Sequence, residues 1–340
     1  MRTILLLLFV LVTLTACVDE KLAKTVQRST QTVQMANYLS EPIRPLITPK
    51  QNADQVQLGE MLFHDVRLSG DCQTSCASCH SLEKGGGDAL PVPVSQGKKL
   101  PFNALSVINA SHNFRQYWNG KLATLEDQID DVMQIDGNMH ANLKEVVTYL
   151  NQLPEYISRF KQVYHNKATE AYFKDALVAY LTSLASPSRF DDFLLGKRDA
   201  ITIDEKMGYL KFKEYGCTTC HQGINVGGNM FQKLGIVRNY FQDRGYISHV
   251  DYGRFNLTKN EADKFVFRVP SLRNIAITAP YLHDGSIGEL SKVIKIMGTY
   301  QLGKDIPDED IKQIEAFLKS LTGKRYDLHE VTAANTLINK

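Results

Sequence analysis

The chain has 340 residues, of which 43% are hydrophobic and 22% are charged, and its formal net charge is +2. This length has room for two ordinary domains, each with its own core. The near balance of charge gives no support for a nucleic acid or an acidic polymer as a partner.

The N-terminus, residues 1–16, predicts an export signal. A charged start precedes an apolar run, Ile4 to Leu14, that is too short to span a bilayer. The run ends at Leu14-Thr15-Ala16-Cys17, which resembles a bacterial lipobox and predicts that Cys17 becomes the first mature residue and carries lipid. An ordinary cleaved signal with an incidental cysteine is the alternative. In both cases we expect a periplasmic protein, and a lipid would anchor it to a bacterial membrane.

The rest of the chain predicts a mainly α fold with long irregular loops. Residues 17–50 are polar and punctuated by three prolines, which favours a tether or a wrapping arm. Helical periodicity then appears in eight stretches: Val56–His64, Thr124–Met133, Leu143–Leu150, Pro154–Tyr164, Thr169–Leu184, Asp204–Tyr215, Glu289–Met297 and Asp308–Leu321. We expect an N-terminal domain over residues 51–190, a C-terminal domain over 191–325 and a tail over 326–340.

Two copies of Cys-x-x-Cys-His carry the chemistry: Cys76-Ala77-Ser78-Cys79-His80 and Cys217-Thr218-Thr219-Cys220-His221. In each motif two thiols can add to the vinyl groups of a porphyrin while the histidine binds its iron. A dithiol pair or half a zinc site leaves the histidine unexplained, and the two pairs lie too far apart for a zinc ribbon. The sequence therefore predicts two covalent c-type haems. Of the six cysteines only Cys72 then lacks a role, and an incidental thiol is its simplest interpretation.

Ordered blocks of sequence extend beyond these motifs, from about Leu58 to Thr322. They are Leu58–Phe63, Arg67–Ser69, Gly85–Asp88, Asn103–Ala104, Tyr117–Gly120, Gly216–Gly223, Phe267–Asn274, Thr278–Gly285 and Gln301–Gly303. In these blocks the chain resembles the bacterial di-haem cytochrome c peroxidases and their relatives. The resemblance implies two cytochrome c-like domains, each holding one haem.

The resemblance also implies that the two haems differ. The haem on His80 would be the peroxidatic one, and the haem on His221 would store and relay an electron. Met297 matches the family's axial methionine, and a His/Met iron is fully ligated and has a raised potential. Met207 and Met230 lie in the same half and are the alternatives, and any of the three may equally fill the core.

The distal side of the first haem departs from the family pattern. Many members carry a histidine that blocks this iron until the other haem is reduced, and Ser95 or Gln96 aligns with it here. Neither is a good ligand of haem iron, so the resemblance implies an iron that is open or water-bound. His112 and His140 are the alternative ligands, although a histidine is more often structural.

A second departure concerns proton transfer, which peroxide cleavage requires between the two oxygens. The family supplies a glutamine, matched by Gln128, and a glutamate ten residues later, where Asn138 stands here. We expect Asp136 to serve as the acid/base in its place. Asp130, Asp131 and Asp136 may equally be solvated charges.

Further site residues rest on the same resemblance. Trp118, the only tryptophan, would lie between the haems and relay electrons, or act as a large core residue. Arg268 and Arg273 would pair with haem propionates or join the domains, with a surface salt bridge as the alternative. A calcium ion would bind between the domains to oxygen atoms of three residues: Asn103, Thr278 and Pro280.

The predicted activity is the reduction of hydrogen peroxide to water with electrons from a small cytochrome c or a cupredoxin. One alternative is the related di-haem enzyme that uses peroxide to oxidise residues of a partner protein. The other is a non-enzymatic electron-transfer or peroxide-sensing cytochrome. The sequence leaves open whether the protein forms a homodimer.

Overall fold

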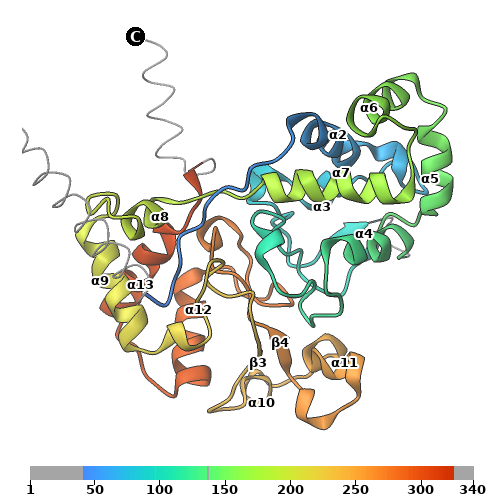
Figure 1. Cartoon of the computed structure of the whole chain (residues 1–340). Coiled ribbons are helices and arrows are strands. Elements are labelled where there is room, and N and C mark those ends of the chain that lie inside the picture. The colour runs from blue at the N-terminus through green and yellow to red at the C-terminus, as the bar shows by residue number, and fades with distance from the viewer. Residues whose placement is uncertain (1–40, 96, 136–137, 325–340) are drawn as a thin grey trace, which may run out of the picture.

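The computed structural model describes residues 41–95, 97–135 and 138–324 (Figure 1). The predicted signal peptide with Cys17, Gln96, Asp136 and the predicted tail lie outside the described residues. Among the helices of the described part, none is long and apolar enough to cross a membrane.

Helices account for most of the regular structure. The longer ones are α2 (Ala53–His64), α4 (Leu125–Gln134), α5 (Leu143–Leu150), α6 (Pro154–Tyr164), α7 (Glu170–Ser183), α9 (Ile203–Glu214), α12 (Leu290–Ile296) and α13 (Asp308–Ser320). The shorter ones are α3 (Cys76–Cys79), α8 (Arg189–Leu194), α10 (Tyr240–Arg244) and α11 (Phe255–Thr258). Two small antiparallel sheets pair β1 (Val94–Ser95) with β2 (Lys98–Lys99), and β3 (Phe231–Lys233) with β4 (Val266–Arg268). The mainly α fold is as predicted, and each predicted stretch contains a helix.

A close helix crossing organises each half of the molecule. Helix α2 packs on α7 in the N-terminal half, and α9 packs on α13 in the C-terminal half. A Cβ atom on Gly59 of α2 would collide with the carbonyl oxygen of Ala176, and one on Gly208 of α9 with that of Gln313. Glycine therefore lets the two backbones approach at both crossings.

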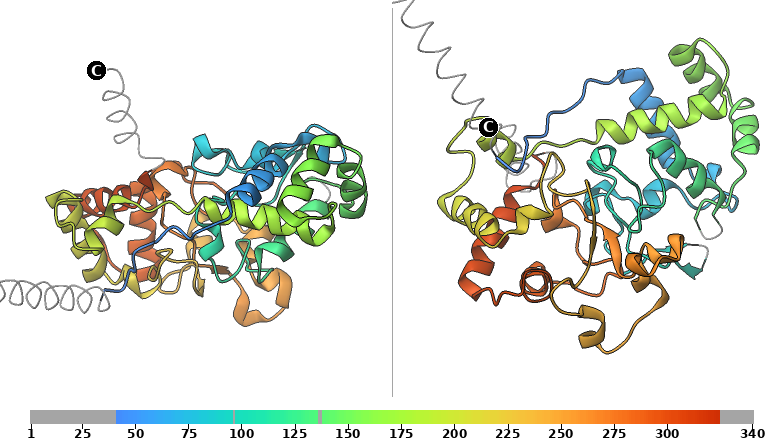
Figure 2. Two further views of the ribbon diagram at one scale, coloured as in Figure 1. Left: turned by 45° about the horizontal axis from the view of Figure 1, so that its top comes forward. Right: turned by 60° about the horizontal axis from the view of Figure 1, so that its bottom comes forward.

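Two hydrophobic clusters surround these crossings. The first extends from Leu58 to Leu184, and the second from Phe190 to Leu321. Ile43 is fully buried in the second cluster, where it forms a β-bridge with Gly223. The described end of the predicted arm thus wraps the C-terminal half before the chain crosses to α2 (Figures 1 and 2).

A buried ion pair holds this arm. The guanidinium of Arg273 donates to both carboxylate oxygens of Asp191, at 2.8 and 2.7 Å, and the two side chains are 0% and 1% exposed. Asp191 also accepts the backbone N–H of Leu46, and Arg273 donates to the carbonyl oxygen of Arg44. Arg273 was expected at a haem propionate or a domain interface. The guanidinium has an anion within the chain and fixes the arm, and the residue also lines the cavity at His221, so its contact with a propionate stays a prediction.

Replacing Asp191 by Asn should lower the free energy of unfolding of the holoprotein by about 3–5 kcal/mol, because the buried Arg273 cation would lose its anion. Chemical denaturation measures this loss. The control is Asp192→Asn, whose carboxylate pairs with the exposed Lys197 and Lys324, so its loss should stay within about 1 kcal/mol. Equal losses in the two variants would contradict the assigned role of the buried pair.

Candidate functional site

Two cavities open beside the two Cys-x-x-Cys-His motifs. The cavity at His221 has a volume of about 480 Å³, and the cavity at His80 one of about 400 Å³. In each, both cysteines and the histidine of the motif form part of the wall. Well-packed interiors hold few voids larger than a water molecule, so cavities of this size are sites for a ligand or cofactor.

The ring of His80 is oriented for metal binding. Its Nδ1 lies 3.1 Å from the carbonyl oxygen of Gly86, in the glycine-rich turn that follows the motif. A proton on Nδ1 would be donated to that carbonyl, which leaves Nε2 unprotonated as a ligand atom. Burial lowers the pKa of His80 and so favours the neutral imidazole that iron requires.

The second motif has the same chemical character. Burial lowers the pKa of His221 to about 4, and it raises the pKa of Cys217 to about 11 and that of Cys76 to about 12. None of the four motif cysteines is in a disulfide. Thiols that burial keeps protonated are poor redox nucleophiles, which argues against a dithiol redox role.

Met297 is the methionine that lines the His221 cavity. It begins a π-helical segment, Met297–Leu302, directly after α12, and such segments are frequent at functional sites. Met207 is 38% exposed on α9, and neither it nor Met230 lines this cavity. Of the three candidate methionines, Met297 is therefore the one that lines the same cavity as His221, and its role as a ligand stays a prediction.

A shared wall separates the two cavities. The residues that line both are Asn103, Ala104, Leu105, Ser106, Asn113, Trp118 and Arg268. The indole Nε1 of Trp118 donates to the carbonyl oxygen of Asn103 at 3.0 Å, which fixes the ring in this partition. The only tryptophan thus lies between the two motifs.

Arg268 is a buried cation in the same partition. Its side chain is 2% exposed and donates to the carbonyl oxygen of Tyr117 and to Oδ1 of Asn113. No carboxylate of the described residues pairs with it, and burial alone lowers its pKa to about 10. A buried charge is costly without an anion, so this residue fits a cofactor that carries carboxylates, as haem does.

The His80 cavity contains some of the predicted distal residues. Gln128, on α4, and Asn138 both line it, so the glutamine and the residue that stands in place of the family glutamate come together. Asp136, the predicted acid/base, lies outside the described residues.

Of the four residues considered as the sixth ligand of the first iron, the structure places one at the His80 cavity. Ser95 lines the His80 cavity and is buried, with a hydroxyl that makes no hydrogen bond to the described residues. Gln96 lies outside the described residues. Neither His112 nor His140 belongs to the cavity wall, so the structure gives no support to either as a ligand.

The three residues predicted to bind calcium all line the His221 cavity: Asn103, Thr278 and Pro280. The amide nitrogen of Asn103 donates to the carbonyl oxygens of Leu90 and Pro91, so the oxygen of this amide is the atom left for a cation.

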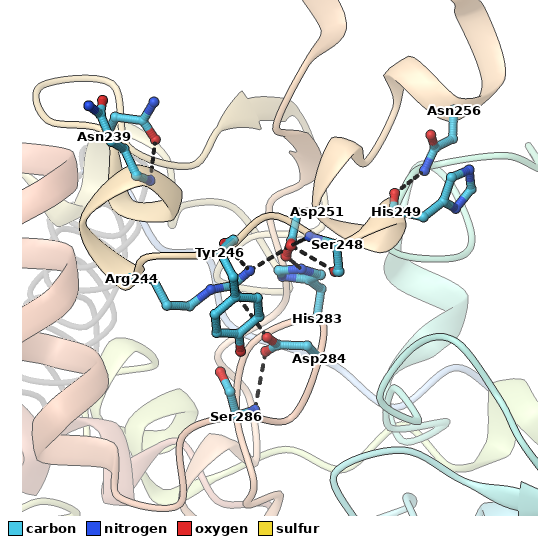
Figure 3. Close-up of polar contacts among 11 residues, drawn as sticks. Asn239, Arg244, Tyr246, Ser248, His249, Asp251, Asn256, His283, Asp284 and Ser286 are labelled. Carbon is cyan, nitrogen blue, oxygen red and sulfur yellow. Dashed lines mark hydrogen bonds and ion pairs between the residues drawn. The ribbon is translucent and has the colours of Figure 1, made fainter.

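Sequence reasoning missed a charge network around the buried Asp251 and His283 (Figure 3). Asp251 accepts from Nε2 of His283 at 2.7 Å and pairs with Arg244 at 2.5 Å, while Arg244 also pairs with Asp284 at 2.9 Å. The edge of the His283 ring faces Trp118, with ring centroids 6.4 Å apart. The sequence feature that could have indicated this network is the adjacent pair His283-Asp284 in the block Thr278–Gly285. Asp251, His283 and Asp284 lie close enough to one another to hold a metal ion. The guanidinium of Arg244 already compensates the charge of both carboxylates, however, which favours an ion-pair network over a metal site.

Asp251→Asn should destabilise the protein most at neutral pH. Burial opposes the charge of Asp251, but hydrogen bonds from His283, Ser248 and Arg244 outweigh it and hold the pKa well below its usual value. A lowered pKa in the folded state stabilises the protein above the unfolded pKa of about 4, and this contribution is lost as the pH falls towards the folded pKa.

The difference in unfolding free energy between the wild type and Asp251→Asn should therefore be about 3 kcal/mol at neutral pH and shrink below about pH 4. Denaturation curves across pH measure it. The control, Asp263→Asn, removes a partly exposed carboxylate and should show a small difference at every pH. A difference for Asp251→Asn that grows on acidification would contradict the assigned direction.

Comparison with known proteins agrees with a haem protein built on two c-type motifs. Residues 53–199 match the family described as di-haem cytochrome c peroxidase. The chain is 39% identical to cytochrome c peroxidase Ccp of Escherichia coli, over 84% of this chain and 62% of that protein. It is 37% identical to cytochrome c551 peroxidase of Pseudomonas aeruginosa, over 85% of this chain and 86% of that protein.

A solved structure is also similar. It is described as a MauG-like protein associated with microbial copper homeostasis, with a TM-score of 0.73 and 27% identity, over 85% of this chain and 98% of that one. The chain thus belongs to the di-haem cytochrome c peroxidase family.

Proposed function

We propose that this member of the family reduces hydrogen peroxide to water with two electrons from a small cytochrome c or a cupredoxin. The observation that carries the proposal is the pair of Cys-x-x-Cys-His cavities with Trp118 in their shared wall. The name of the Pseudomonas aeruginosa relative, cytochrome c551 peroxidase, supports a small cytochrome as the donor.

Each cavity would hold one covalent haem, in one cytochrome c-like domain. Cys76 and Cys79 would attach the first haem, and His80 would bind its iron; Cys217 and Cys220 would attach the second haem, with His221 and Met297 as iron ligands. All seven residues line the respective cavities. Bound haem supplies the one-electron chemistry and the site for peroxide. The buried cation of Arg268 supports this assignment, because a haem propionate would give it an anion.

The residues of the chain would divide the remaining work. His80 would hold its iron from one side, and peroxide would enter the cavity on the other side, where Gln128 can donate or accept a hydrogen bond. Met297 would close the second iron to substrate. Trp118, held by Asn103, would couple the two cavities.

Other parts of the proposal rest on the sequence. A calcium ion would be bound by oxygen atoms of Asn103, Thr278 and Pro280, since calcium prefers oxygen ligands. The protein would be periplasmic and anchored to a membrane through a lipid on Cys17, whose position follows a lipobox-like run.

The related enzyme that oxidises a partner protein is the second candidate, because an open iron on His80 would suit that role as well as peroxide reduction. In that enzyme the second haem has no methionine ligand, as the family resemblance implies. In this chain a methionine, Met297, lines the His221 cavity. Met297 therefore favours the peroxidase.

Steady-state assay of the full holoprotein with peroxide and a reduced small cytochrome c tests the proposal. Rapid oxidation of the cytochrome supports a peroxidase. Slow turnover with a long-lived oxidised protein would indicate the partner-oxidising enzyme, and no reaction a sensor or carrier. If the first iron is open, electron paramagnetic resonance of the fully oxidised protein should show a high-spin ferric signal. Two low-spin haems would contradict the open site.

Met297→Leu should lower turnover at least about tenfold, or ~1.4 kcal/mol in the barrier, because the second iron would lose its sixth ligand. The absorption and paramagnetic resonance spectra of the oxidised protein should change with it. Met207→Leu is the matched control, at an exposed position of α9, and should leave both unchanged. Unaltered spectra in Met297→Leu would show that another group is the ligand.

A further inference from the structure

Peroxide reduction requires protons as well as electrons. Each H₂O₂ takes up two protons and two electrons to give two H₂O, so the donor protein supplies the electrons and the solvent must supply the protons. The side chain of Asn138 cannot carry a proton, and Asp136 lies outside the described residues. Another group in the wall of the His80 cavity must therefore be considered.

Asp131 is the only carboxylate among the described residues that line the His80 cavity. It lies on α4, three residues after Gln128, so the two side chains project from the same face of the helix. Its Oδ2 atom is buried and makes no hydrogen bond to the described residues. Buried polar atoms without a partner are uncommon, so this oxygen can accept from a cavity water in addition to the neighbouring hydroxyl of Tyr117.

Two further buried oxygens of the same cavity lack a partner among the described residues. They are the hydroxyls of Ser95 and Tyr117. Burial and the nearby carboxylate of Asp131 raise the pKa of Tyr117, which keeps its hydroxyl protonated. The hydroxyl of Tyr117 thus lies beside the carboxylate of Asp131, and with Ser95 the cavity brings together a carboxylate and two hydroxyls, an arrangement suited to proton transfer.

The same carboxylate also reaches the solvent side. Asp131 and Ile135 line both the His80 cavity and an outer pocket of about 370 Å³, whose wall includes Asp127 and Asp130. Oδ1 of Asp131 pairs with Nζ of Lys121 at 2.5 Å, and the lysine side chain is 41% exposed. Lys121 also lines the His80 cavity, so the route to the outside is the wall that Asp131 shares with the outer pocket, and the ion pair fixes the carboxylate between the two.

We propose that Asp131 delivers protons from the outer pocket to peroxide in the His80 cavity, in place of the carboxylate that is missing at position 138. In each transfer the carboxylate takes a proton from water in the outer pocket and passes it to a cavity water or to the peroxide oxygen. Lys121 compensates the charge of the carboxylate when it holds no proton. This inference rests on the proposed peroxidase function.

The test replaces Asp131 by Asn, which keeps the shape but cannot carry a proton. Turnover of the holoprotein with peroxide should fall about 10²-fold, the usual contribution of acid–base catalysis. A second measurement does not depend on activity: hydrogen cyanide must lose its proton to bind ferric iron, so its association should also slow at least about tenfold. Asp131→Glu should restore most of both rates.

The matched control is Glu126→Gln, which removes the same charge from an exposed position on α4 that lines none of these cavities. Both of its rates should equal those of the wild type. Unchanged rates in Asp131→Asn, equal slowing in Glu126→Gln, or lost haem in Asp131→Asn would each overturn the proposal. Absence of peroxide turnover in the wild type would instead contradict the proposed function, and the cyanide measurement would still decide the role of Asp131.

Discussion

The wall between the two cavities contains a cation that has no anion among the described residues. Arg268 is buried there, and its backbone N–H donates to the carbonyl oxygen of Trp118 at 2.8 Å. An isolated buried charge costs several kcal/mol. The charge of Arg268 would be compensated when the carboxylates of a cofactor enter one of the cavities. Binding of a propionate-bearing cofactor would therefore stabilise the same segment that holds the tryptophan. Cofactor loading and the order of the partition are coupled through one side chain.

The two sides of the partition have different electrical surroundings. On the C-terminal side, the carbonyl oxygen of His283 accepts the backbone N–H of Asn103, whose own carbonyl oxygen holds Trp118. His283 is fixed in turn by Asp251. The N-terminal side has α4, with Gln128 and Asp131 at the His80 cavity. Electrons and protons would then reach the first cavity from separate sides, so a change in one route need not disturb the other.

The sequence predicted what local patterns determine. Helical periodicity predicted the eight longer helices but not the short α3, α8, α10 and α11, and the covalent chemistry of the Cys-x-x-Cys-His motif required a cavity beside each copy. It did not predict that Arg273 pairs with Asp191, because a periodic pattern carries no information on partners so distant in the chain. The sequence also could not predict the place of Asp131. This residue follows Asp127 and Asp130 on α4, and only the packing of the helix shows which of the three carboxylates lines the His80 cavity. The network of Arg244, Asp251 and His283 depends on packing in the same way.

The position of Asp131 also bears on why Asn138 is tolerated. Two carboxylates in one small cavity repel each other, and burial strengthens the repulsion, so one would be held protonated. With Asp131 already in the wall and paired with Lys121, a second carboxylate at position 138 would add this cost. An amide at that position keeps hydrogen-bonding capacity without charge. The asparagine and the aspartate are thus electrostatically compatible in one cavity, where a glutamate and the same aspartate would compete for protons.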